Sequence, residues 1–162
     1  MKTSEKVRRI ACYGIVLVFL LALLVSCGVT LKNWSDPLWI LNDRWRLSSP
    51  VPAAGELIFY ASDQGFLGDG TVQYVFAFSA VPAEFLSGFS AGRDEETENA
   101  LLRCVWERGG DGCAPDFAEE YLWRHCVQKP YMTGGKVRYY TEEMYMAYFP
   151  ASLLLYVCED LS

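Results

Sequence analysis

The sequence predicts an α+β fold, in which an N-terminal membrane anchor helix precedes a small two-layer domain with an antiparallel sheet and two to three helices. Three observations carry this prediction: an uncharged apolar run near the N-terminus, segments rich in aromatic and β-branched residues, and a middle region with helical spacing of apolar residues. The length of 162 residues suits one domain better than two. Hydrophobic residues make up 52% of the chain, which excludes intrinsic disorder.

Residues 1–31 form the predicted anchor. Residues 10–31 carry no charge, and a helix of that length rises about 33 Å, enough for a hydrocarbon core of roughly 30 Å. The preceding residues 1–9 hold four basic residues and one acidic residue. Because basic flanks stay in the cytoplasm, the rest of the chain is expected outside the bacterial cell membrane.

Two interpretations of this segment remain open. One is an uncleaved signal anchor, which stays on the protein as a spanning helix. The other is a lipoprotein signal peptide, because residues 24–27, Leu-Val-Ser-Cys, resemble the bacterial lipobox, and Gly28 suits the position that follows. This resemblance implies that Cys27 carries the lipid and becomes the new N-terminus. Both interpretations give the same topology.

Residues 32–54 are predicted to be a linker between the anchor and the displayed domain, which covers residues 55–162. Three tryptophans alternate with charged residues in this segment, and Pro50 and Pro52 favour an extended backbone. Tryptophans beside an apolar span suit the membrane interface, and they suit packing against the domain equally well.

A β-hairpin is predicted at the start of the domain. Residues 57–60 and 71–78 are rich in aromatic and β-branched side chains and apolar on both faces, so both strands are expected in the middle of a sheet. The connection contains three glycines and ends in Asp69-Gly70, which is a strong turn signal.

Three helices are expected next. A short one begins at Pro82, a residue type favoured in the first turn. The second covers residues 94–108, where three acidic residues suit the positive end of the helix dipole and two glycines follow the last residue. The third runs from about residue 115 to 128, on the spacing of its apolar residues.

The C-terminal part returns to β-structure. Residues 136–140 form one candidate strand, and residues 152–157 form another that is apolar on both faces and therefore expected to be central. The predicted order of two strands, the helices and two strands is typical of an α+β domain.

Charge excludes one class of partner for the displayed part. Without residues 1–31 the chain has a net charge of about −9, which disfavours contact with nucleic acids and anionic lipid head groups. A protein or small-molecule partner remains open, and the only membrane contact expected is through the N-terminal helix or lipid.

Four cysteines beyond the anchor allow three full pairings. Cys104 and Cys113 form the easiest local pair, because only a short Gly-rich turn separates them, and an exported location permits disulfides. The alternative is that the cysteines are free, small apolar residues. They are Cys104, Cys113, Cys126 and Cys158.

Only one segment has the composition of a chemical site. Asp63 and Asp69 flank glycines and could form a structural turn or an ion site. An EF-hand loop that starts at Asp63 would need a bidentate glutamate where Tyr74 stands. A structural hairpin turn is therefore the favoured interpretation.

The sequence predicts no catalytic set, no cofactor and no metal site. The only histidine, His125, is expected on a helix flank, and Cys113 and Cys126 lack the close pairing that structural zinc prefers. Runs typical of serine hydrolases, phosphate-binding loops, dinucleotide-binding folds and zinc proteases are not found in the sequence.

Two stretches resemble a family of small bacterial membrane-anchored or lipoprotein sequences of uncharacterised function. Residues 65–70 read G-F-L-G-D-G before an aromatic strand, where the family has G-F-H-G-D-G. Residues 153–160 resemble its late strand, after which a further Tyr-rich strand follows. This chain differs in that Leu67 replaces the histidine and the chain stops at Ser162. The resemblance implies no activity.

We therefore expect a membrane-anchored, exported domain with a non-catalytic role in binding or interaction at the bacterial cell envelope. One alternative is a hydrolase-like enzyme that uses the carboxylates of Asp63 and Asp69, which a cleft joining them to His125 would favour. The other is a truncated, non-functional copy of a longer domain, which an unpaired sheet edge at the C-terminal strand would favour.

Overall fold

The computed structural model describes most of the predicted domain and short parts of the N-terminal region. The chain divides into two compact units, Met1–Asp43 and Arg44–Ser162. The described residues are 17–23, 36–64, 69–106, 113–128, 132–133, 136–137 and 142–161.

Little of the predicted anchor belongs to the described residues. Residues 17–23 are helical and their side chains are exposed, whereas the rest of residues 10–31, with Cys27, lies outside the described ranges. Within the described residues, none of the helices has both the length and the apolar character needed to cross a bilayer.

The predicted linker contains a helix, which corrects the expectation of a wholly extended segment. Helix α2 (Pro37–Trp45) follows Asp36, whose carboxylate Oδ1 accepts a hydrogen bond of 3.0 Å from the backbone N–H of Leu38. A side-chain acceptor before the first turn is a typical helix N-cap. The two prolines lie in residues 50–55, which have no regular secondary structure, so their preference for an extended backbone does not reach the helix.

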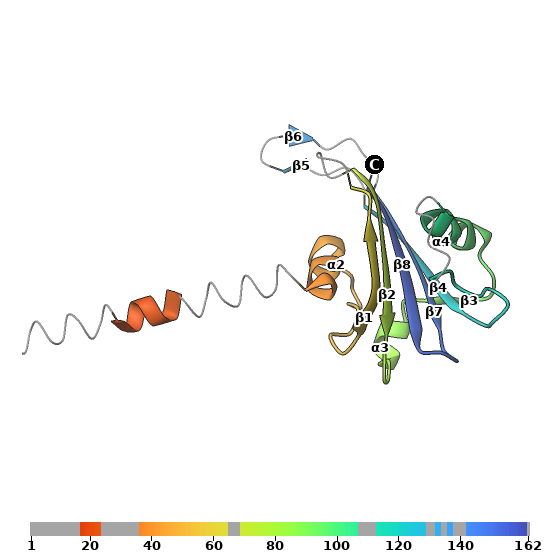
Figure 1. Ribbon diagram of the computed structural model, residues 1–162, viewed down its shortest axis with the longest axis horizontal. Helices are drawn as coiled ribbons and strands as arrows, with labels where there is room; N and C mark the ends of the chain where they lie inside the picture. Colours follow the sequence, from red (N-terminus) through yellow and green to blue (C-terminus); the bar gives the residue numbers. More distant parts are fainter. Residues whose placement is uncertain are drawn as a thin grey trace, which may run out of the picture. The chain divides into compact units, whose positions relative to one another are not determined.

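A six-stranded antiparallel sheet forms the framework of the second unit (Figure 1). Its strands lie side by side in the order β1 (Glu56–Ser62), β2 (Gly70–Ala77), β8 (Leu154–Leu161), β7 (Glu142–Phe149), β4 (Leu122–Gln128) and β3 (Ser90–Ala91). A separate two-stranded sheet is formed by β5 (Met132–Thr133) and β6 (Lys136–Val137). Together with the helices, this arrangement confirms the α+β class and the antiparallel sheet.

The predicted hairpin is confirmed, but the position of one strand in the sheet was wrong. β1 pairs with β2 from Glu56↔Ala77 to Ser62↔Val72. β1 is the edge strand, and its residues alternate between exposed and half-buried, so apolar residues such as Ile58 and Tyr60 stay largely exposed. β2 is central, as expected, and is buried along most of its length.

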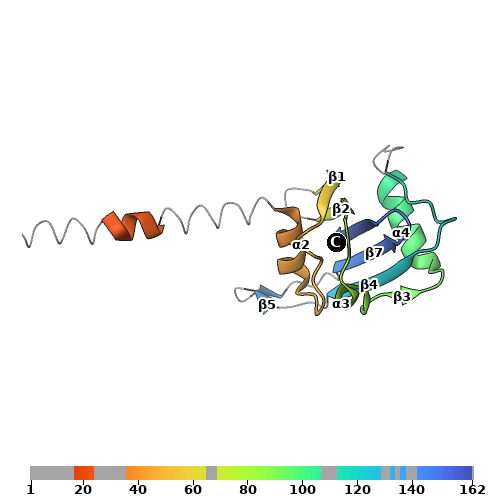
Figure 2. The ribbon, with the colours of Figure 1, turned by 90° about the horizontal axis from the view of Figure 1, so that it is seen from below.

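Helices α3 (Ala83–Leu86) and α4 (Glu95–Trp106) confirm the first two predicted helices. α4 begins after Asp94, whose Oδ2 accepts a 2.9 Å hydrogen bond from the backbone N–H of Thr97. This N-cap satisfies one of the free donors at the helix start. The apolar side of α4 packs on one face of the sheet, against β2, β4, β7 and β8 (Figure 2).

A disulfide joins α4 to the central strand β8. It links Cys104 to Cys158, with 6.5 Å between their Cα atoms, and Cys113 and Cys126 are free. The expected pairing of Cys104 with Cys113 is therefore wrong. Proximity in sequence favoured Cys113, but the packing of α4 on the sheet places Cys104 directly against Cys158.

The predicted helix over residues 115–128 is the largest error in the fold. Residues 122–128 form β4, which pairs with β7 from Leu122↔Tyr148 to Gln128↔Glu142. β7 itself was not predicted, because its glutamates, methionines and alanine favour a helix when tertiary context is left out. The two strands stabilise each other in the sheet, and this non-local pairing overrides local propensity.

The C-terminal strands differ in outcome. The strand expected at residues 152–157 is β8, and it is central as predicted, between β2 and β7. The unpaired edge that would favour a truncated copy is therefore not found along β8. Of the strand expected at residues 136–140, Lys136–Val137 form β6, and residues 138–140 lie outside the described ranges.

Candidate functional site: a polar cluster beneath helix α4

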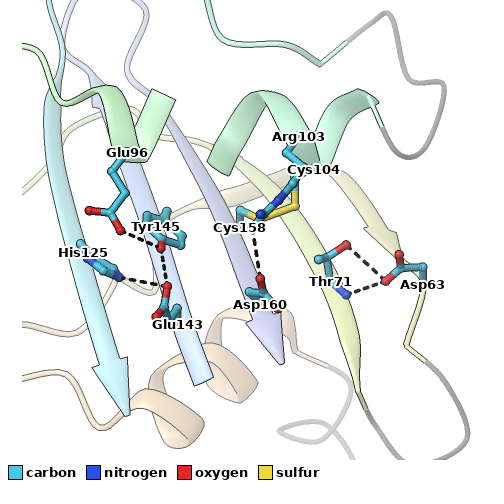
Figure 3. A network of polar contacts seen from close by, with 10 residues as sticks. All are labelled: Asp63, Thr71, Glu96, Arg103, Cys104, His125, Glu143, Tyr145, Cys158 and Asp160. Atoms are coloured by element: carbon cyan, nitrogen blue, oxygen red, sulfur yellow. Dashed lines mark hydrogen bonds and ion pairs between the residues drawn. A yellow bond between two sulfur atoms is a disulfide. The ribbon is translucent and has the colours of Figure 1, made fainter. Parts of the chain in front are cut away.

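The only histidine of the chain belongs to a group of polar side chains beneath α4 (Figure 3). His125 lies on β4 and pairs directly with Tyr145 on β7, so both side chains extend from the same face of the sheet. Glu143 precedes Tyr145 by two residues and shares that face. Glu96, in the first turn of α4, approaches from above. Three elements thus converge on one point.

Tyr145 is the centre of this cluster. Its hydroxyl donates a hydrogen bond to Oε2 of Glu143, and it lies 3.3 Å from Oε1 of Glu96. The ring of His125 stacks on the Tyr145 ring, with 4.3 Å between centroids and 10° between planes. Nε2 of His125 lies 3.6 Å from Oε2 of Glu143. The packed rings fix where the imidazole nitrogen faces.

Among the described residues, the cluster holds two carboxylates, one phenol and one imidazole. Burial, followed by the hydrogen bond to Glu143 and the charges of Glu143 and Glu96, raises the pKa of Tyr145 well above its usual range, so the phenol keeps its proton. One phenolic proton can serve only one of the two carboxylates at a time. Nε2 of His125 is buried and has no hydrogen-bond partner among the described residues. The cluster therefore combines two carboxylates with a nitrogen that has no hydrogen-bond partner among the described residues.

This geometry suits ion or ligand binding. One oxygen from each of Glu96 and Glu143 and a nitrogen of His125 all lie within 4.8 Å of one another. Glu96 is exposed and the Glu143 side chain is 35% exposed, so both carboxylates border solvent, whereas Nε2 of His125 is buried behind them. These three residues could hold a metal ion.

A second polar cluster is buried on the opposite face of the sheet. Glu159 of β8 is fully buried, and its carboxylate accepts hydrogen bonds from Tyr74 (2.9 Å), Arg44 (3.0 Å) and the indole N–H of Trp45. Burial raises the pKa of Glu159, and Arg44 with the three donors opposes this effect. The cluster fastens the chain around residue 45 to the sheet, with the Glu159 carboxylate buried and the Arg44 side chain 31% exposed.

A hollow of about 490 Å³ opens beside the edge strand β3. Its lining combines the rings of Phe117 and Tyr121 with charged groups, among them Arg93 and Glu119. Arg93 forms an ion pair of 2.8 Å with Glu98, and the Tyr121 hydroxyl donates to the same carboxylate at 2.6 Å. The mixed lining suits a ligand or peptide with both apolar and polar groups.

The two predicted carboxylates have a different setting. Asp63 accepts hydrogen bonds from the backbone N–H of Thr71 (2.6 Å) and from its hydroxyl (3.2 Å), and so closes the hairpin. Gly70 next to it has a φ of +121°, and a Cβ there would lie 2.8 Å from Oδ1 of Asp63. Asp69 immediately precedes this glycine, and residues 65–68 between the two carboxylates lie outside the described ranges.

Asp63 and His125 are not brought together. Asp63 follows β1, His125 lies on β4, and β2, β8 and β7 stand between them in the sheet. At about 4.8 Å per strand, the separation is roughly 19 Å. The cleft that would favour a hydrolase is absent at these described residues.

Sequence reasoning missed Glu96, Glu143 and Glu159 as site residues. Glu96 resembles any of several acidic residues at a helix start. Glu143 was missed because β7 was not predicted, and Glu159 was missed because the predicted strand ended at residue 157. The period-two pattern that puts His125, Glu143 and Tyr145 on one face was visible only once the pairing of β4 with β7 was known. Cys27 lies outside the described residues, so the structure does not bear on it.

No family model, curated protein or solved structure matches this chain. The resemblance to small bacterial envelope sequences therefore stays a prediction from the sequence.

Proposed function

We propose that the chain is a bacterial envelope protein, held at the membrane by its N-terminal segment, whose α+β domain is displayed outside the cytoplasm as a non-catalytic binding module. The observation that carries this proposal is the disulfide between Cys104 and Cys158. It agrees with the topology expected from the basic residues 1–9 and the apolar residues 10–31.

The disulfide supports display because such bonds persist in oxidising compartments and are rare in the cytosol. Both cysteines are buried in the core between α4 and the sheet, alongside Leu101 and Ala147. They are 54 residues apart in sequence, and closing a loop of that size stabilises a fold by about 4 kcal/mol in the chain-entropy account. A bond with that effect is useful only where it stays oxidised.

Binding is favoured over hydrolysis by the positions of the acidic side chains. Asp63 is engaged by Thr71 in the hairpin, and it is separated from His125 by three strands. The hollow beside β3, lined by Phe117, Tyr121 and Arg93, offers a recognition surface instead. The net charge of about −9 keeps this domain away from nucleic acids and anionic head groups.

Anchoring is tested by fractionation and intact mass of a C-terminally tagged full chain, expressed in bacteria. We expect the protein in the membrane fraction. A mass that lacks residues 1–26 and includes added lipid identifies Cys27 as the lipidated residue, and a mass without cleavage identifies a retained helix. Recovery of the tagged chain in the cytosol contradicts the proposal.

Display is tested on the same membranes by labelling thiols with a maleimide mass tag before and after reduction. Reduction should expose two further thiols, and peptide mapping should assign them to Cys104 and Cys158. A Cys126→Ser variant serves as control, because it lowers the total count without changing this difference. If Cys104 and Cys158 are labelled without reductant after denaturation, the domain does not reside in an oxidising compartment.

A further inference from the structure

We propose that Glu96, His125 and Glu143 form a binding site for a first-row divalent transition metal ion, and that Zn²⁺ suits this site. The proposal goes beyond the proposed function and is independent of it, because the site depends only on the packing of α4 on β4 and β7. Figure 3 shows the three side chains directed toward a common point, with Tyr145 between them.

The distances are close to those that a metal requires. Zinc binds nitrogen and oxygen at about 2.0–2.2 Å, so the ligand atoms of a tetrahedral ion lie about 3.3 Å apart. Nε2 of His125 and Oε2 of Glu143 are already 3.6 Å apart, and all three ligand atoms lie within 4.8 Å. The carboxylate of Glu96 would have to move furthest to reach a bound ion. Its side chain is exposed on the first turn of α4 and is therefore free to change rotamer.

A bound cation would interact favourably with two features of the cluster, the unpaired nitrogen of His125 and the neighbouring carboxylates of Glu96 and Glu143. The buried Nε2 of His125 has a free coordination position, since no hydrogen bond occupies it among the described residues. The carboxylates of Glu96 and Glu143 share a single phenolic proton. The arginines with described ion pairs on this side are engaged elsewhere, Arg93 with Glu98 and Arg103 with Asp160. A divalent ion would place positive charge between the two carboxylates and occupy the free position on Nε2.

The donor set points to the class of ion. An imidazole nitrogen with two carboxylates suits zinc and neighbouring transition ions, whereas calcium and magnesium prefer oxygen ligands alone. Three protein ligands leave at least one position of a four-coordinate ion open. Such a site can therefore also hold an exchangeable ligand from solvent or from a partner.

The test uses the full chain in detergent micelles after removal of metal by a chelator. Zn²⁺ is titrated by calorimetry, and Co²⁺ is added separately as a spectroscopic probe. We expect one saturable Zn²⁺ site and a Co²⁺ spectrum of nitrogen and oxygen coordination. This spectrum matters because the free thiols of Cys113 and Cys126 could also bind zinc, and they would give an intense thiolate-to-cobalt band instead.

Two variants locate the site. Glu96→Gln removes one ligand from an exposed position without disturbing the core, and His125→Asn removes the nitrogen ligand. Each should weaken Zn²⁺ binding by at least about tenfold. Glu95→Gln is the matched control, because Glu95 is an exposed neighbour on the same turn outside the cluster, and it should bind like the wild type.

Three results would each overturn the proposal. They are the absence of saturable binding to the wild type, equal affinity of Glu96→Gln and the wild type, and a thiolate band in the Co²⁺ spectrum that accounts for the bound ion. None of these results bears on the export or anchoring of the chain.

Discussion

Glu159 shows how a single buried acid can govern the response of the fold to pH. Its carboxylate is enclosed between β8, Tyr74 and Trp45, and burial raises its pKa above the ordinary value of 4.5. The folded protein therefore binds this proton more tightly than the unfolded chain does. The resulting contribution to stability is present in full below about pH 4.5, and it is lost as the pH rises through the raised pKa.

The prediction is that Glu159→Gln removes this part of the pH dependence. Free energies of unfolding from denaturant titration, measured at several pH values above 4.5, should decline more steeply in the wild type than in the variant. Asp160→Asn is the control, because Asp160 lies on the opposite face and pairs with the exposed Arg103. Parallel curves for the wild type and Glu159→Gln would show that Glu159 does not titrate in this interval.

Asp63 has a structural role in the hairpin, and its loss should be measurable. Asp63→Ala removes the two hydrogen bonds that the Asp63 carboxylate accepts from the backbone N–H and the hydroxyl of Thr71. We expect a loss of about 1–2 kcal/mol in the free energy of unfolding. Asp69→Ala serves as the comparison, and a larger loss for Asp69→Ala than for Asp63→Ala would contradict the assignment. Thermal and denaturant unfolding of both variants measure the difference.

At the scale of elements, the disulfide attaches helix α4 covalently to strand β8 of the sheet. The described contacts of α4 to β8 are the bond from Cys104 to Cys158, the 3.1 Å ion pair from Arg103 to Asp160 and the buried packing of Leu101. The ion pair is exposed and contributes little, so the covalent link and the apolar packing carry the attachment.

Reduction of this disulfide should therefore loosen α4 first. We expect the free energy of unfolding to fall by about 4 kcal/mol and hydrogen exchange to rise at residues 95–106 before it rises in β8. A Cys104→Ala, Cys158→Ala double variant should resemble the reduced wild type and should not respond to reductant. An equal response of both proteins to reductant would contradict this origin.

The elements also show where sequence reasoning succeeds. α4 was predictable from its own residues. Asp94 and the acidic residues after it are typical of a helix start, and the apolar residues of α4 recur at helical spacing. β2 was predictable because it is buried on both faces, so its apolar run is continuous. In both elements the signal lies within the element itself.

The failures share a different cause. β4 and β7 carry weak local signals, and each becomes a strand through pairing with the other, while β7 also pairs with β8. The polar cluster inherits this difficulty, because His125 and Tyr145 meet only through that pairing. The disulfide does so too, since its partners come from a helix and a strand 54 residues apart. Local sequence does not encode such contacts, which is why the candidate site was missed.

At the scale of the whole molecule, the middle of the sheet is built from distant parts of the chain. β2 pairs with β8, so Gly70 meets Leu161 and Ala77 meets Leu154. The centre of the sheet cannot form before the chain has been synthesised up to residue 161, because β2 pairs with β8. Such non-local pairing is intrinsically slow.

The charge of the displayed part leads to a last prediction, on how the chain is held at the membrane. With a net charge of about −9, the domain is repelled by anionic lipid, so the proposed attachment would depend on the apolar residues 10–31. The membrane-bound chain should therefore resist washing with about 1 M salt, which screens charge, and should dissolve only in detergent. Immunoblots of pellet and supernatant measure this.

The matched variants test the same point within residues 17–23. Leu20→Arg with Leu21→Arg introduces two charges into the apolar run, each with an insertion cost of about 2.5–3.5 kcal/mol at the centre of a spanning helix. This variant should move to the soluble fraction, whereas Leu20→Ile with Leu21→Ile should stay in the pellet. Release of the wild type by salt alone would mean that charge rather than apolar burial holds the chain at the membrane, which would contradict the proposed anchor.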